Sequence, residues 1–272
     1  MKTYQELVKG AEDWMASHGF DPTDPDRLTM ELYNKTPGKL HLEDGIDCPI
    51  CLNRGTYMEI IDGHKYDPIC ECMKRRRAIA QLKKSGLYDM AKRYTLEAFK
   101  RETPWHKLMF ESAERFLADE SAWMYVGGQV GCGKTHICAA VVSKLVENNV
   151  AAKYLLWRDE STRLKGLLTE GSAYQRALTE VKEVPLLYID DLFKTSRHAA
   201  MPSAGDINLA FEIINHRYNN RRLRTVISGE WTMDELCAFD EGIGSRIYER
   251  AKGCSVEIQK GIERNYRLSA GG

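Results

Sequence analysis

A short stretch near the middle of the chain has the residue types and spacing needed to hold a phosphate group. It runs from Gly128 to Thr135 and reads GxxxxGKT, after an apolar run at 122–126 and before a helical pattern at 136–147. Glycines let the backbone curl so that successive N–H groups point at one anion, and a helix N-terminus adds partial positive charge. The strand, loop and helix context predicts a P-loop rather than a chance glycine-rich turn.

This P-loop predicts ATP and Mg²⁺ as cofactors. Lys134 can reach the β- and γ-phosphates, and the Thr135 hydroxyl can ligate Mg²⁺. The residues predicted to bind the nucleotide are Gly128, Gln129, Val130, Gly131, Cys132, Gly133, Lys134, Thr135 and His136.

Two adjacent carboxylates, Asp190 and Asp191, end a later apolar run at 184–189. A buried parallel strand reads as a continuous apolar run, and sites form at the carboxyl ends of such strands. We predict that Asp190 binds Mg²⁺, directly or through water, and that Asp191 orients and deprotonates the attacking water. A strand that ends in a solvated acidic turn is the alternative.

Two further segments carry candidate catalytic side chains. The segment 224–229 is a strand that should lie beside the P-loop strand, which would place Ser228 or Glu230 near the γ-phosphate; an ordinary strand-end turn is the alternative. Arg246 lies just inside a predicted helix. An arginine there can project into a neighbouring subunit's nucleotide and stabilise the charge that develops on the γ-phosphate, or it can form a surface salt bridge.

Four cysteines near the N-terminus have the spacing of a zinc site. Cys48 and Cys51 form a CxxC, and Cys70 and Cys72 form a CxC after a predicted hairpin that turns at residues 62–63. Four thiolates can bind Zn²⁺ tetrahedrally, and the metal would stabilise a module too small for its own core. His64 at the hairpin tip could replace one cysteine as a zinc ligand. The alternative to a zinc site is that the cysteines are free and have only a structural role.

The bulk composition excludes strong global attraction to nucleic acid or membranes. The 272 residues include 39 basic and 39 acidic ones, so the formal net charge is zero. No apolar run approaches the roughly 20 residues that span a bilayer. The N-terminal residues do not resemble a secretion signal. We therefore expect a cytoplasmic protein without a membrane partner, whose cysteines are reduced or metal-bound.

The pattern of elements predicts an α/β fold with a parallel sheet flanked by helices. An amphipathic helix is expected at 1–20, and a basic helix from Met73 to about Ser85 ends at Gly86. We predict an N-terminal helical and zinc-binding domain at 1–86, a linker at 87–104 and an ATPase domain at 105–272. The strands are expected at 122–127, 151–157, 184–190, 224–229 and 253–258.

With these motifs assembled, the chain resembles the AAA+ helicase loaders of the DnaC/DnaI type, in the versions carried by phages and mobile elements. The resemblance covers nearly the whole chain. It includes the cysteine module, the basic helix, the segment 94–99 that flanks the adenine in the family, the P-loop, 186–191 and 244–247.

The resemblance implies roles for individual residues. Lys134 and Thr135 match the Walker A pair, Asp190 and Asp191 the Walker B pair, and Arg246 the arginine finger. Glu230 stands where the family usually has a sensor asparagine. An ionised carboxylate cannot donate a hydrogen bond to phosphate, so this departure puts the sensor's role in doubt. We identify no arginine for a second sensor.

The resemblance also implies partners and a function. The N-terminal module would bind the hexameric replicative helicase, and the ATPase domain would self-associate and contact single-stranded DNA. The DNA-contact candidates are Arg158, Arg163 and Lys165, the cluster Arg217, Arg221, Arg222 and Arg224, and the basic run 74–77. Each of these groups could also be a solvated face.

Three functions compete. The chain would load the replicative helicase onto single-stranded DNA during replication initiation. Alternatively, it would be an IstB-like ATPase that regulates DNA transposition, although that family mostly lacks the cysteine pairs. The third possibility is a nucleotide-sensing interaction module with little turnover, which Glu230 favours.

Overall fold

The computed structural model describes residues 9, 13–14, 17, 24–85, 87–195 and 201–269. The helix expected at 1–20 lies largely outside the described residues. Gly86, the predicted end of the basic helix, lies outside them as well. The chain divides into two compact units, Met1–Arg76 and Arg77–Gly272. The domain boundaries at 86 and 104 stay a prediction, since the division between the units falls inside a helix.

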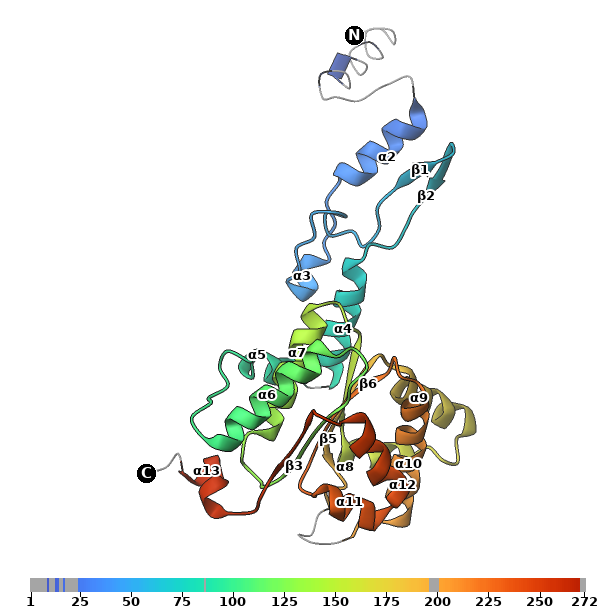
Figure 1. The fold of residues 1–272 in the computed structure, drawn as a ribbon. Coiled ribbons are helices and arrows are strands. Elements are labelled where there is room, and N and C mark those ends of the chain that lie inside the picture. Colours follow the sequence, from blue (N-terminus) through green and yellow to red (C-terminus); the bar gives the residue numbers. More distant parts are fainter. Residues whose placement is uncertain are drawn as a thin grey trace. The chain divides into compact units, whose positions relative to one another are not determined.

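The first unit is built from short elements. Helix α2 (Pro25–Lys35) starts at an Asp24 cap with proline in its first turn, and α3 (His41–Asp44) follows. Strands β1 (Glu59–Ile61) and β2 (His64–Tyr66) pair antiparallel (Figure 1). Asp62 and Gly63 between them have φ of 51° and 78°, as a two-residue hairpin turn requires. The hairpin predicted at this position is confirmed.

The segment predicted to be a linker contains a helix. Helix α4 (Cys72–Ser85) is followed by α5 (Leu87–Arg93), which packs against α7 (Lys134–Glu147). Leu87 and Phe99 are buried within the second unit. Helix α6 (Pro104–Ala118) then begins at a Thr103 cap. Much of 87–104 is therefore attached to the second unit by apolar burial, which the polar composition of the segment concealed.

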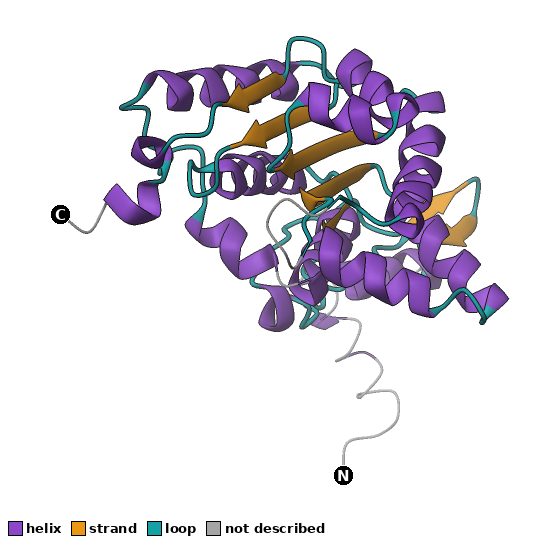
Figure 2. Ribbon diagram, turned by 90° about the horizontal axis from the view of Figure 1, so that it is seen from below, coloured by secondary structure: helices purple, strands orange, loops and turns teal. Residues whose placement is uncertain are grey.

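The second unit contains, within the described residues, a five-stranded sheet in the order β4-β5-β6-β3-β7, and every neighbouring pair is parallel. Figure 2 shows the helices on both of its faces. The predicted α/β architecture is confirmed, and the strand at 224–229 lies beside the P-loop strand as expected. The strands are β3 (Met124–Gly128), β4 (Ala152–Leu156), β5 (Leu186–Leu192), β6 (Arg224–Gly229) and β7 (Ser255–Ile258).

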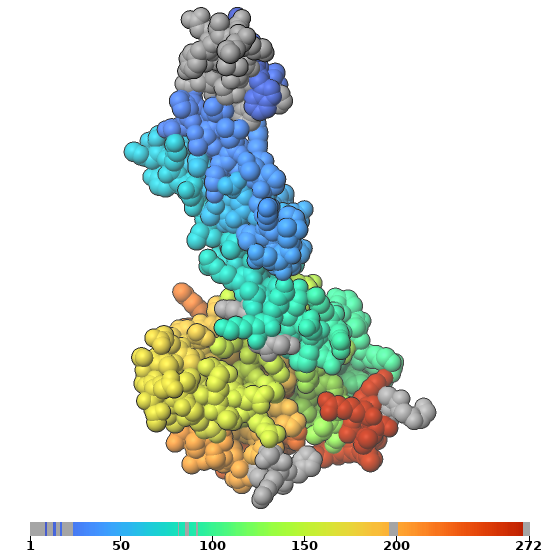
Figure 3. All heavy atoms as spheres, turned by 180° about the vertical axis from the view of Figure 1, so that it is seen from behind, coloured from blue at the N-terminus to red at the C-terminus, as the bar shows by residue number. Residues whose placement is uncertain are grey.

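The remaining helices cover the sheet. Helices α8 and α9 lie together on one side of the second unit and the C-terminal α13 lies on the other (yellow and red in Figure 3). Two helices cross closely at Gly244, where a side chain would collide with the backbone of Cys237. The elements are α8 (Trp157–Gly166), α9 (Gly171–Glu183), α10 (Ala204–Asn219), α11 (Met233–Phe239), α12 (Glu241–Arg250), the 3₁₀ turn η1 (Ile262–Arg264) and α13 (Tyr266–Ser269).

None of the helices in the described ranges is both long and apolar enough to cross a bilayer.

Candidate nucleotide and zinc sites

The P-loop has the backbone that its glycines predict. Gly128 has a φ of 98°, and a side chain on it would collide with the carbonyl of Ile258, to which the Gln129 N–H donates at 2.9 Å. Gly133, the residue that precedes helix α7, has a φ of 101°. Both conformations are open to glycine at little cost and strained for other residues. The loop therefore presents the start of α7 to a ligand, in the geometry that binds anions.

Lys134 lies at the base of this loop and is 7% exposed. Its Nζ donates to the carbonyl oxygens of Gly128 and Gln129 at 2.9 and 2.7 Å. Burial lowers the pKa of Lys134, although nearby carboxylates oppose this shift. The ammonium is held close to where phosphate oxygens would bind.

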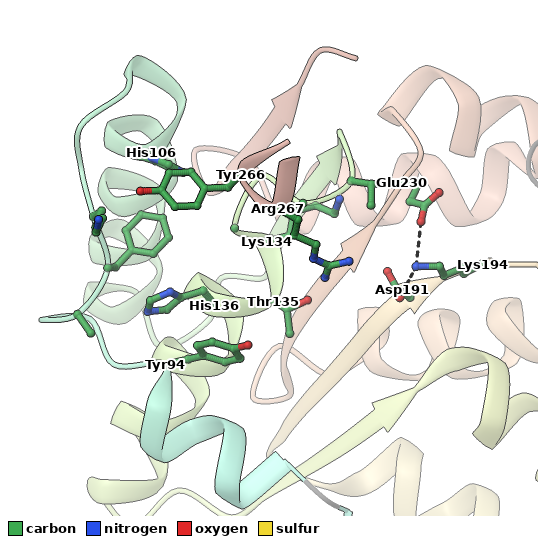
Figure 4. A pocket seen from close by; sticks show the side chains of 16 residues that line it. Tyr94, His106, Lys134, Thr135, His136, Asp191, Lys194, Glu230, Tyr266 and Arg267 are labelled. Atoms are coloured by element: carbon green, nitrogen blue, oxygen red, sulfur yellow. Dashed lines mark hydrogen bonds and ion pairs between the residues drawn. The ribbon is translucent and has the colours of Figure 1, made fainter. Parts of the chain in front are cut away.

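A pocket of about 420 Å³ opens in front of the P-loop (Figure 4). The P-loop supplies one wall, including Lys134 and Thr135, and the ends of β5 and β6 supply another. The residues that line it are Tyr94, Ala98, Phe99, Lys100, His106, Val130, Gly131, Gly133, Lys134, Thr135, His136, Asp191, Lys194, Glu230, Tyr266 and Arg267.

One end of the pocket is aromatic. His136 packs 4.9 Å from the ring of Tyr94 and 5.1 Å from that of Phe99, measured between ring centroids. His106 lies 5.4 Å from Phe99 and 5.9 Å from Tyr266 in the same way. Flat apolar walls with a few polar edges suit a purine base, so the pocket combines an end suited to a base with an end suited to phosphate.

The two adjacent carboxylates have different surroundings. Asp191 lines the pocket, whereas Asp190 is 4% exposed and lies behind it. The hydroxyls of Tyr188 and Tyr154 donate to Asp190 at 2.9 and 3.0 Å, and that of Ser228 donates as well. Burial raises the pKa of Asp190, and these hydroxyls partly offset the shift. Asp191 as the base and Asp190 as a Mg²⁺ ligand stay predictions.

The donor set fits a hard cation. Thr135 and Asp191 line the same pocket and bring a hydroxyl and a carboxylate to it, the oxygen ligands that Mg²⁺ prefers. Asp190 is not among the lining residues, and its carboxylate oxygens accept from the hydroxyls of Tyr188, Tyr154 and Ser228. A bound Mg²⁺ would supply positive charge to the β- and γ-phosphate oxygens.

Glu230 forms an ion pair with Lys194, which the sequence did not predict. The ammonium of Lys194 lies 2.9 Å from a carboxylate oxygen of Asp191 and 2.9 Å from one of Glu230 (dashed lines in Figure 4). Burial alone would lower the pKa of Lys194, but the two carboxylates raise it above its usual value. The ammonium is therefore fully charged at neutral pH.

Arg246 does not line this pocket. It lies on α12, where its Nη1 donates to the carbonyl of Gly242 at 2.7 Å and its guanidinium faces the rings of Phe211 and Tyr218. An arginine finger acts on a neighbouring subunit's nucleotide, so this position is compatible with that role, which stays a prediction.

The four predicted zinc ligands converge in the first unit. The Sγ atoms of Cys48, Cys51, Cys70 and Cys72 all lie within 4.8 Å of one another. The Cys48–Cys70 and Cys51–Cys72 sulfur separations are 3.7 and 3.6 Å. A tetrahedron with Zn–S bonds of about 2.3 Å has sulfurs about 3.8 Å apart, so the cluster fits zinc without rearrangement. His64 is in strand β2 outside the cluster.

Arg76 supports this cluster rather than a basic surface. It is 5% exposed, and its Nε donates to Cys72 Sγ at 3.5 Å while Nη2 donates to Asn53 at 3.0 Å. Asn53 also accepts from the Cys48 N–H at 2.9 Å. Hydrogen bonds of this kind orient metal-bound thiolates and offset their negative charge.

Comparisons with known proteins agree with this geometry. No family model matches the chain. The XkdC protein of the phage-like element PBSX of Bacillus subtilis (strain 168) is 27% identical over 233 residues, 82% of this chain and 86% of the relative. The replicative helicase loader DnaI of the same organism is 24% identical over 234 residues, 77% of this chain and 73% of the relative.

A crystal structure of the DnaC helicase loader has the same fold, with a TM-score of 0.53, 22% identity, and coverage of 63% of this chain and 99% of that one. The resemblance to AAA+ proteins of the DnaC/DnaI type is confirmed. The second unit has the fold of the DnaC helicase loader's solved structure, and the cysteine cluster that precedes this unit in the chain fits a zinc site.

Several residues that line the pocket could not be predicted from the sequence. Lys194 follows the paired acids closely, but nothing local shows that its side chain turns toward Glu230. His106, Tyr266 and Arg267 come from helices α6 and α13, at opposite ends of the domain in sequence. Arg267 extends into the pocket, whereas we identified no arginine for a second sensor from the sequence (Figure 4).

Two of the arginines considered for DNA contact are structural in the second unit. Arg217 is fully buried and Arg224 is 7% exposed. Arg217 donates to the carbonyls of Val184 and Arg224 at 2.8 and 2.6 Å, and burial lowers its pKa to about 9. Neither guanidinium can reach a DNA phosphate.

The other candidates lie on the surface. Arg163 pairs with Glu160 at 2.5 Å and Lys165 with Asp206 at 2.7 Å. Arg158, Arg221 and Arg222 are exposed. Arg77 of the basic run is exposed as well, and Arg221 lies 3.8 Å from a carboxylate oxygen of Glu249.

The cysteine cluster predicts that zinc supports the first unit. Cys72→Ser should release zinc and expose residues 24–76 to protease, because thiolate–zinc bonds replace a hydrophobic core there. Zinc content by mass spectrometry and limited proteolysis check this, with Cys237→Ser as the control outside the cluster. Wild-type protein that is folded and free of zinc after chelation would contradict it.

The buried imidazoles predict a pH dependence of stability. Burial lowers the pKa values of His106 and His136, so the unfolded chain binds more protons than the folded one as the pH falls below about 6.5. Stability should therefore fall between pH 7 and 5.5. The loss should be smaller in His136→Gln, whereas the exposed His64→Gln should behave as wild type. Thermal melts at both pH values measure this, and an unchanged pH effect in His136→Gln would count against it.

Proposed function

We propose that this chain is an ATPase that loads a hexameric replicative helicase onto single-stranded DNA during replication initiation. The observation that carries the proposal is the convergence of Lys134, Thr135 and Asp191 on one pocket with an aromatic end. The similarity to a protein named a replicative helicase loader supports the biological role.

The chemistry follows from the positions of these side chains. Lys134 neutralises charge on the β- and γ-phosphates, and Thr135 and Asp190 are the candidate Mg²⁺ ligands. A water oxygen attacks the γ-phosphorus, and the bond to the bridging oxygen of ADP breaks. Asp191, at the pocket wall, accepts the proton of that water.

The proposal requires neighbouring subunits. Arg246 lies outside its own chain's pocket, so as an arginine finger it would act on the nucleotide of an adjacent copy. Self-association side by side would complete each site, and the exposed arginines Arg158, Arg221 and Arg222 are candidate contacts for single-stranded DNA.

A nucleotide-sensing switch with negligible turnover is the second candidate. The Lys194–Asp191 ion pair favours it, because the ammonium occupies a carboxylate oxygen of Asp191 that the attacking water would need to contact. Measuring ATP hydrolysis with and without single-stranded DNA distinguishes the loader from the switch. No turnover in any condition would favour the switch.

Lys134→Ala should reduce ATP affinity at least about tenfold, since hydrogen bonds to charged groups contribute roughly 1.5–3 kcal/mol. Asp191→Ala should bind ATP and fail to hydrolyse it. Calorimetry and phosphate release measure these effects, and Lys144→Ala on the outer side of α7 is the control. Hydrolysis retained in the Lys134 variant would show that the pocket is not the site.

The loader role predicts a complex with a hexameric replicative helicase in the presence of ATP. The full chain should co-purify with the helicase, and Cys72→Ser should lose this association while it still binds ATP. Wild-type protein that binds duplex DNA as ATP-dependent filaments, and no helicase, would instead support the transposition alternative.

A further inference from the structure

Lys194 occupies a position that neither the P-loop nor the paired acids explain. Its side chain is 39% exposed and reaches into the pocket that holds Lys134 and Thr135. Its partners Asp191 and Glu230 are only 24% and 21% exposed. An ammonium group carries three N–H donors, so two carboxylate contacts leave one for another anion.

The backbone at the end of β5 is bent to place this lysine. Asp191 and Phe193 have φ of 55° and 59°, which is costly for residues with a Cβ, and the pairing with β6 shifts register here. Packing of the buried Phe193 ring stabilises this strained backbone, since the ring packs edge-on against Trp157 and Phe239. Strained backbone persists where the surroundings over-determine it, and such sites cluster at functional positions.

The end of β6 is tied to the same turn. Trp231 donates from its ring Nε1 to the carbonyl of Phe193 at 3.4 Å, and its own carbonyl accepts from the hydroxyl of Tyr125 at 2.5 Å. Tyr125 belongs to the P-loop strand. Glu230, next to Trp231, is thereby fixed relative to both the P-loop and Lys194.

We propose that Lys194, held by Glu230, contacts the terminal phosphate of a bound nucleoside triphosphate and distinguishes it from a diphosphate. This inference rests on the proposed nucleotide site. A carboxylate cannot donate to a phosphate oxygen, whereas the Glu230–Lys194 pair presents an ammonium that can. Lys194 supplies the donor, and Glu230 is a positioning residue.

The arrangement also connects the nucleotide to the catalytic base. Without a γ-phosphate the ammonium stays 2.9 Å from a carboxylate oxygen of Asp191 and occupies the place where a water would contact that oxygen. A γ-phosphate, with more negative charge than one carboxylate, draws the ammonium toward itself while Glu230 keeps it in place. Asp191 becomes available to water only when a triphosphate is bound.

The first test compares Lys194→Met with wild type in the full chain, by calorimetry with Mg²⁺ and either a non-hydrolysable ATP analogue or ADP. Loss of a charged hydrogen bond predicts a fall in analogue affinity of about tenfold to a hundredfold. ADP affinity should change by less than about twofold. Lys144→Met, which removes a lysine outside the pocket, is the control.

The second test uses Glu230→Gln, which keeps the shape of the side chain and removes the charge that holds Lys194. Analogue affinity should fall by roughly threefold to tenfold and ADP affinity should not, while Glu230→Asp should restore part of the loss. This variant decides the question if Lys194→Met fails to fold, as circular dichroism would show.

Three results would overturn the inference. The first is equal loss of analogue and ADP affinity. The second is no loss of either, and the third is faster hydrolysis in Lys194→Met with unchanged analogue affinity, since Lys194 would then only mask Asp191. Wild-type protein that binds neither nucleotide would instead overturn the proposed ATPase function.

Discussion

One buried carboxylate connects the parts of the candidate nucleotide site. Asp190 has almost no contact with solvent, and an ionised group in that position requires hydrogen bonds to compensate for lost hydration. The bonds come from Tyr154 on β4, Tyr188 on β5 and Ser228 on β6. Three neighbouring strands are therefore held in register at their carboxyl ends, where the site lies.

The same bonds determine what surrounds the pocket. Ser228 Oγ also accepts from the N–H of Asp191 at 3.3 Å, so the hydroxyl that satisfies one acid orients the next. Residues that follow β5 and β6 then meet in a fixed geometry, and Lys194 falls between Asp191 and Glu230. A sheet with a different strand order would separate these side chains, however good its P-loop.

Buried arginines away from the site also link neighbouring elements through hydrogen bonds. Arg217 links the end of α9 to β6, and Arg250 donates to the carbonyls of Tyr218 and Ser121 at 3.1 and 2.7 Å. Arg76 does the same beside the cysteine cluster. In each case a guanidinium with five donors satisfies backbone or thiol acceptors that would otherwise be buried without partners. Basic residues in this chain are therefore poor indicators of DNA contact unless their burial is known.

The sequence by itself determined the features that depend on short spacing: the P-loop, the apolar strands, the hairpin turn at Asp62 and Gly63, and the two cysteine pairs. A few neighbouring residues determine these features, because the conformational freedom of glycine, the length of an apolar run and the spacing of two cysteines are all local properties of the sequence. Only the tertiary structure decided that Arg217 is buried, that residues 87–93 form a helix on α7, and that Tyr266 faces His106. These three features depend on contacts between segments that are far apart in the sequence. His106 on α6 and Tyr266 on α13, for example, are 160 residues apart and are brought together by the crossovers of the parallel sheet. For the same reason Glu230 is an anomaly in the sequence, whereas in the folded chain it is the partner of Lys194.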